Sequence, residues 1–208
     1  MSDLTYTDRL DRLDAMLAEG RIIRGRWTST DAHGRETACL LSALSPEAAD
    51  AESAAACPSD VMPSWLAELT PDIDDLTTAA AWPGIVRRYG ALAHRWHVLD
   101  AAAWRRAESR TWFEILAIAA PHDTEFVVEP VAALWRRVVA GDEPALEEWY
   151  AARAAARAAA WDAAEASVQD AAWDAARAAA KASVWDSIAT ACLDAIEAEC
   201  EAAEAVHV

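Results

Sequence analysis

The stretch "WDSIATACLDAIEAECEAAEA" (residues 185–205) carries apolar side chains that recur with the spacing of a helix. It contains no Gly or Pro, so nothing in it interrupts a helix. At about 100° per residue, four apolar side chains fall within about 60° of Trp185. They are Ile188, Cys192, Ile196 and Cys200. The spacing therefore predicts a helix with this stripe facing a core.

A second face of the same helix carries only carboxylates. Five of them fall between about 100° and 180° from Trp185 and extend over ~27 Å: Asp186, Asp194, Glu197, Glu201 and Glu204. One interpretation is a solvated face. The other is an acidic surface that docks on a basic groove, with roughly half the charge density of a DNA strand, which has about one phosphate per 3.4 Å.

The preceding residues contain a tryptophan repeat. Trp149, Trp161, Trp173 and Trp185 lie twelve residues apart, and the 64 residues from Ala145 onward contain 27 Ala and no Gly or Pro. Twelve residues rotate a helix by about 120° beyond three full turns, so these side chains do not share a face. We expect residues 144–208 to form one long helix or a helical hairpin bent near 166–170, with each Trp meeting a different neighbour.

The first 143 residues are predicted to form a helical globule with one β-hairpin. The hairpin strands are expected at about 22–28 and 36–42, around the turn "TDAHG", in which Gly34 provides a positive φ. A short helix is expected to stop near Pro71. Further helices are predicted within 7–20, 79–99, 100–120 and 128–141, the third of them capped by Asp100. The fold class is mainly α (α+β).

Charge restricts the possible partners. The 208 residues carry a net charge of −17, with nine acids and no Lys or Arg in residues 36–86 and six acids and no base in residues 182–208. Binding to nucleic acid or to an anionic membrane requires a basic footprint, so neither is expected, and a basic protein is the natural partner. The chain lacks a transmembrane run and an N-terminal signal core, and its four cysteines are expected to be reduced, so a cytoplasmic location is expected.

Motifs for chemistry are scarce. The "TPDIDD" segment groups Asp72, Asp74 and Asp75, which fit a capped turn or a partner-binding acidic patch better than a metal loop. His94 and His97 are correctly spaced to bind zinc together, but no third ligand is evident. No catalytic or cofactor motif occurs, so no catalytic residue, cofactor or metal is predicted. Three Arg pairs are expected to pair internally with the acidic blocks 36–86 and 182–208. They are 87–88, 105–106 and 136–137.

Three ordered segments carry a resemblance: "RGRWTSTDAHGRETACLLSALSPE" (24–47), "CPSDVMPSWLAELTPDIDD" (57–75) and "AAAWPGIVRRYGALAHRWHVLDAAAWRRAE" (79–108). With the Ala/Trp tract that follows, they resemble acidic proteins of phages and bacterial mobile elements, anti-CRISPR inhibitors among them. The resemblance implies a non-enzymatic inhibitor in a bacterial host. Its partner would be a basic CRISPR effector complex or nuclease. The charge pattern, and not the resemblance, indicates the contact residues, which are Asp186, Asp194, Glu197, Glu201, Glu204, Asp72, Asp74 and Asp75. The alternative is a helical scaffold module that self-associates into a homo-oligomer.

Overall fold

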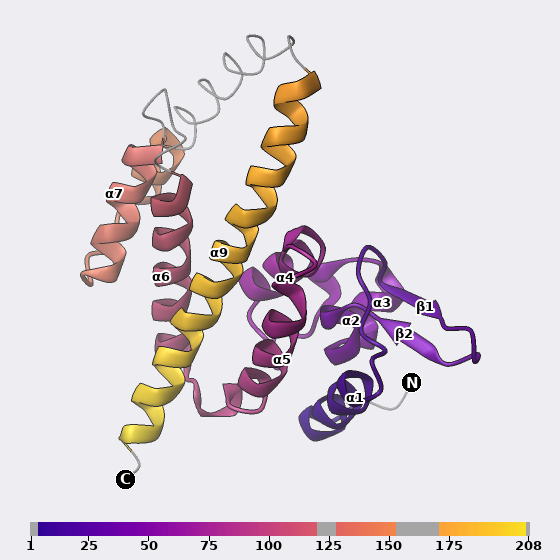
Figure 1. Ribbon diagram of the computed structural model, residues 1–208. Helices are drawn as coiled ribbons and strands as arrows, with labels where there is room; N and C mark the ends of the chain where they lie inside the picture. The colour runs from indigo at the N-terminus through magenta and orange to yellow at the C-terminus, as the bar shows by residue number, and fades with distance from the viewer. Residues whose placement is uncertain (1–3, 120–127, 153–170, 207–208) are drawn as a thin grey trace.

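The computed structural model describes residues 4–119, 128–152 and 171–206. In this part of the chain the fold is mainly α, with one antiparallel two-stranded hairpin, as predicted (Figure 1). The helices are α1 (Tyr6–Ala18), α2 (Leu40–Leu44), α3 (Pro46–Ala51), α4 (Ser64–Leu76), α5 (Trp82–Ala93), α6 (Ala101–Ala119), α7 (Val128–Val139) and α9 (Ala171–Ala205). Two 3₁₀ turns, η1 (Ala54–Ala56) and η2 (Trp96–Val98), and a helical segment at 146–152 complete them.

The hairpin is shorter than predicted. Strands β1 (Thr28–Thr30) and β2 (Glu36–Ala38) pair around a turn in which Gly34 has a φ of 77°. The predicted strands at 22–28 and 36–42 are therefore wrong in extent. Residues 40–44 instead form α2, because Cys39 caps this helix and its leucines are fully buried against other helices.

Helix α4 continues through Pro71, contrary to the predicted stop. A proline inside a helix removes one backbone hydrogen bond and costs about 3 kcal/mol. The buried face of α4 offsets this cost, since Leu66, Leu69, Thr70 and Ile73 all pack into the core. The helix consequently carries its aspartates as helical residues rather than on a turn.

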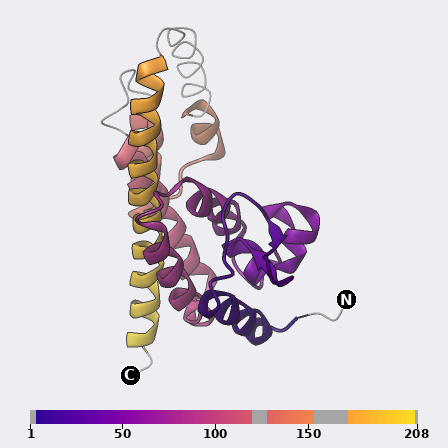
Figure 2. The ribbon, with the colours of Figure 1, turned by 45° about the vertical axis from the view of Figure 1, so that its right-hand side comes forward.

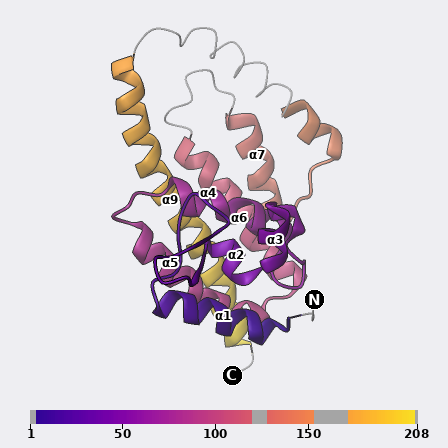
Figure 3. The ribbon, with the colours of Figure 1, turned by 90° about the vertical axis from the view of Figure 1, so that its right-hand side faces the viewer.

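The predicted apolar stripe of α9 is confirmed. Ile188, Cys192, Ile196 and Cys200 are buried, and Trp185 packs against the core at its edge. Helix α9 crosses the molecule beside α6, with α4 and α5 on its other side (Figure 1). Turned views show α9 along one side of the molecule and α1–α3 with the hairpin on the opposite side (Figures 2 and 3). The end of the 144–208 element thus shares one core with the first 143 residues.

The described tryptophans of the repeat meet different neighbours. Trp149 packs edge-on against Trp135 of α7 with ring centroids 4.8 Å apart, whereas Trp185 contacts the core around α9. The side chains of Trp161 and Trp173, and the predicted bend at 166–170, lie outside the described part of the chain. Within the described residues no helix is long and apolar enough to span a membrane.

Candidate interaction surface

The predicted acidic stripe of α9 faces two arginines of the same chain. Arg88 of α5 donates to Glu197 and lies 2.6 Å from Asp194, measured from Nη2 to Oδ1. Arg95, which follows α5, binds Glu204 with two hydrogen bonds of 2.9 Å each. This paired geometry lowers the pKa of Glu204. We call the group of Arg88, Arg95, Asp194, Glu197 and Glu204 the arginine seam, and it joins α9 to α5 and the residues after α5.

The two remaining stripe residues behave differently. Asp186 accepts from the backbone N–H and the hydroxyl of Thr78, both at 2.7 Å, and thereby fixes the chain just before α5. Glu201 is exposed and has no hydrogen-bond or ion-pair partner among the described residues. Of the five predicted stripe carboxylates, Glu201 alone is therefore uncompensated within the described part of the chain.

Glu199 is an acidic residue that the stripe analysis missed. Its side chain is only 2% exposed, and it is clamped by Arg106 and Arg110 of α6 at 2.7 and 3.1 Å. It lies at about −40° from Trp185, inside the apolar stripe. A carboxylate at a core position requires a counter-charge on a neighbouring helix, because an unpaired buried charge is costly. Arg106 and Arg110, four residues apart on one face of α6, provide it. The expected pairing of arginines with the acidic blocks is confirmed for Arg88 and Arg106. Arg105, Arg136 and Arg137 instead bind acids outside those blocks, and Arg87 donates to the carbonyl of Pro83.

The three aspartates of the "TPDIDD" segment have three different environments. Asp74 is buried and accepts from the backbone N–H of Leu40 at 3.1 Å and from Trp82 Nε1 at 2.6 Å. Burial raises the pKa of Asp74 to about 6. Asp75 accepts from the backbone N–H of Gly25 at 2.5 Å, and Asp72 is exposed without a described partner. Asp74 thus supports the fold from inside, and Asp72 is the most available of the three.

Arg24 lies next to these aspartates but binds their backbone. Its Nε donates to the carbonyl of Asp74 at 2.7 Å, and its Nη2 donates to the carbonyls of Asp75 and Thr77 at 2.6 and 2.5 Å. These bonds satisfy carbonyls that the end of α4 leaves without helical partners. The Asp72 carboxylate remains without a cation, and burial together with the nearby charge of Asp75 raises its pKa.

Uncompensated carboxylates gather in the base-free segment 36–86. Five of them are exposed and have no hydrogen-bond or ion-pair partner among the described residues: Asp50, Glu52, Asp60, Glu68 and Asp72. We call these five the free acid set. Of these five residues only Asp72 is predicted as a contact from the sequence, although the absence of Lys and Arg from this segment points equally to all of them.

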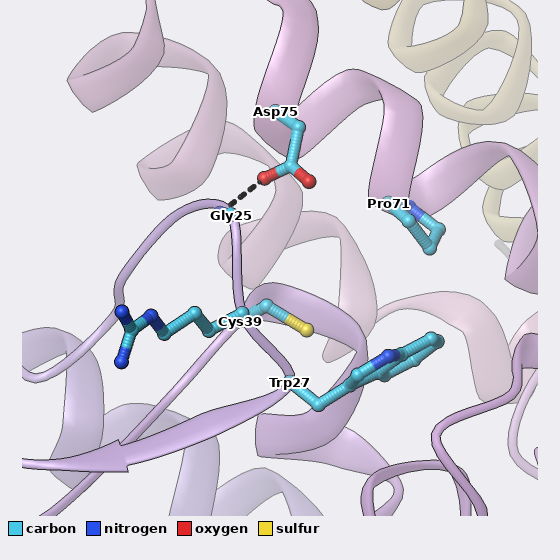
Figure 4. A pocket seen from close by; sticks show the side chains of 6 residues that line it. Gly25, Trp27, Cys39, Pro71 and Asp75 are labelled. Atoms are coloured by element: carbon cyan, nitrogen blue, oxygen red, sulfur yellow. Dashed lines mark hydrogen bonds between the residues drawn. The ribbon is translucent and has the colours of Figure 1, made fainter.

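Two hollows adjoin this segment. A cavity of about 140 Å³ lies between the hairpin and α4, and Figure 4 shows the Cys39, Pro71 and Trp27 side chains around it, with Asp75 bound to Gly25. A larger groove of about 510 Å³ lies between the loop 59–62 and the chain leading from η2 into α6. Its wall includes the buried Trp96, whose Nε1–H has no hydrogen-bond partner among the described residues. Leaving such a donor unpaired costs about 1–3 kcal/mol.

His94 and His97, the two histidines spaced to bind zinc, each contact another group of the protein. His94 Nε2 lies 3.0 Å from Asp14 Oδ1, and His97 Nδ1 lies 2.8 Å from the carbonyl oxygen of His94. The described residues contain no group of three or more His, Cys, Asp or Glu arranged to hold a metal ion.

Comparison with protein-family models, curated proteins and solved structures finds no match to this chain.

Proposed function

We propose that this protein is a non-enzymatic acidic inhibitor that binds a basic, nucleic-acid-handling protein. The observation that carries the proposal is the free acid set, whose five exposed carboxylates lie in a segment that contains no Lys or Arg. Unpaired surface charge of one sign accelerates encounters with a partner of opposite sign. A basic nucleic-acid groove has the complementary charge.

The proposed contact surface is shifted from the one that the sequence indicates. Glu197, Glu204 and Asp194 hold α9 in place through the arginine seam, so a partner would have to compete with Arg88 and Arg95 for them. The free acid set and Glu201 have no such internal competitor among the described residues. We therefore place the primary contact on the free acid set, with Glu201 as an accessory.

The particular target that the resemblance indicates is a CRISPR effector complex or another nuclease of a bacterial host. The test is displacement of labelled DNA from a panel of such purified proteins at low ionic strength, followed by fluorescence anisotropy. The Asp50→Asn/Glu68→Gln/Asp72→Asn variant should lose about tenfold in apparent affinity, as expected for three rim charges.

The control variant is Asp11→Asn/Glu114→Gln/Glu147→Gln, which removes the same charge at exposed acids outside the free acid set that have no described partner. It should inhibit as well as the unmodified protein. Equal loss in both variants would mean that net charge alone drives binding, and no displacement by the unmodified protein across the panel would remove the proposal.

A self-associating scaffold is the second candidate, because three large apolar side chains near the end of α7 are exposed: Val139, Leu146 and Tyr150. It predicts an oligomer whose mass in analytical ultracentrifugation rises with concentration, and a Leu146→Ser/Tyr150→Ser variant that stays monomeric. A protein that sediments as a monomer at every concentration would rule this candidate out.

A further inference from the structure

The groove beside Trp104 is built from four separate parts of the chain. Tyr6 of α1, the loop 59–62, the segment 96–99 and the start of α6 line its volume of about 510 Å³. Val61, Met62 and Leu99 provide aliphatic wall, and Trp104 provides a half-buried aromatic one. A hollow of this size, with apolar walls and a few polar groups, has room for a ligand or an inserted side chain.

The polar groups that line the groove include the carboxylate of Asp60, the imidazole of His97 and the hydroxyls of Tyr6 and Ser59. Asp60 has an exposed carboxylate without a described partner. His97 Nδ1 faces a carbonyl oxygen, which can only accept, so in the neutral ring Nε2 is left as an acceptor. The hydroxyl of Tyr6 donates to the carbonyl of Ala93 at 2.6 Å, so its proton is already engaged.

Among the residues that the structure describes, no Lys or Arg lines the groove. Arg9 is the cation whose charge reaches Asp60, but it is itself bound to the carboxylate of Glu47 and the carbonyl of Leu44. A hollow with an aromatic wall and a free carboxylate fits a cation on an aliphatic stem. A planar guanidinium fits better than an ammonium, because it can stack on the indole and bind the carboxylate with two hydrogen bonds.

We propose that this groove receives an arginine side chain of the basic partner, with its stem against Val61 and Met62 and its guanidinium between Trp104 and Asp60. This inference rests on the proposed function and names a point of contact within it.

The test uses two blocked peptides as probes, acetyl-Leu-Arg-Leu-amide and the same peptide with citrulline, which has the shape of arginine without its charge. The full chain is labelled with 5-fluorotryptophan, and the ¹⁹F resonance of Trp104 is assigned with a Trp104→Phe variant. We expect the arginine peptide to shift the Trp104 resonance and to bind about tenfold more tightly than the citrulline peptide.

Two variants decide whether Asp60 is responsible. Asp60→Asn should reduce the arginine preference to about twofold or less, whereas Glu114→Gln, at an exposed acid outside both the groove and the free acid set, should leave it unchanged. An unshifted Trp104 resonance, equal binding of the two peptides, or an unchanged preference in Asp60→Asn would each overturn the proposal.

The outcomes also separate this inference from the proposed function. If the protein displaces DNA from a basic protein but no peptide binds at Trp104, the proposed arginine site is rejected and the proposed function is kept. An arginine preference at Trp104 without any displacement would keep the groove and show that its partner is not a nucleic-acid-handling protein.

Discussion

Asp74 connects three helices through one buried carboxylate. Its Oδ2 accepts from the start of α2 at Leu40, and its Oδ1 accepts from the indole of Trp82 at the start of α5, while its own backbone belongs to α4. The two hydrogen bonds favour the ionised form, but burial outweighs them and raises the pKa of Asp74 to about 6. The folded protein therefore binds a proton here more tightly than the unfolded chain does.

The direction of the pH dependence follows from this shift. The pKa of Asp74 rises from 3.8 to about 6 on folding, so its contribution to stability is fully present below about pH 4 and is lost as the pH rises through about 6. The loss approaches about 3 kcal/mol. Urea unfolding at a series of pH values should show this decrease in the free energy of unfolding in the unmodified protein and in Asp50→Asn, but not in Asp74→Asn. Parallel curves for unmodified protein and Asp74→Asn would contradict the assignment.

The sequence grouped Asp72, Asp74 and Asp75 because they are adjacent, and it could not separate them. A helix that ends near Pro71 leaves the residues after it without a defined rotation about its axis. In a continuous helix Asp74 lies about 200° from Asp72, which places one in the core and the other in solvent. Whether a proline ends a helix depends on the burial of the neighbouring face, and burial is a tertiary property.

At the scale of elements, the two faces of α9 were predictable and its partners were not. Periodicity alone identifies the apolar stripe and the acidic face, because both depend only on spacing. The arginines that meet the acidic face come from residues about a hundred positions earlier in the chain, and no local pattern links Arg88 to Glu197. The charge balance of the chain predicted that arginines would pair internally, without identifying which acids they would meet.

The clamp on Glu199 makes a prediction for α9. Glu199→Gln should destabilise the protein by about 1–3 kcal/mol, below the 3–5 kcal/mol of a fully buried pair because Arg106 and Arg110 are half exposed to solvent. Glu201→Gln, two residues away and exposed, should change stability by about 0.5 kcal/mol or less. Urea unfolding at one pH measures the change in the free energy of unfolding for each variant. Equal changes would show that the ion pairs of Glu199 do not stabilise the fold.

At the scale of the whole molecule, α9 completes a core that begins at α1. Leu13 of α1 and Leu193 and Ile196 of α9 belong to the same buried cluster. The fragment 1–143 keeps α1 to α7 but loses every side chain that α9 contributes. We expect it to lack a cooperative thermal transition by circular dichroism and to bind the dye ANS, since its core is open on one side. A sharp transition in the fragment would show that residues 1–143 fold independently.

The alkylation rate of a buried thiol in α9 reports how often this helix detaches from the core. Cys192 is fully buried, and burial raises its pKa to about 12, while the half-buried Cys57 lies outside α9. Because the thiolate is the nucleophile that attacks an alkylating reagent, the buried Cys192 is inert while α9 is packed. It reacts only when α9 separates from α5 and α6. The ratio of the alkylation rate of Cys192 to that of Cys57 therefore reports how often α9 detaches. A partner that binds α9 in its packed position would slow the alkylation of Cys192. A partner that binds the carboxylates of the arginine seam in place of Arg88 and Arg95 would accelerate it.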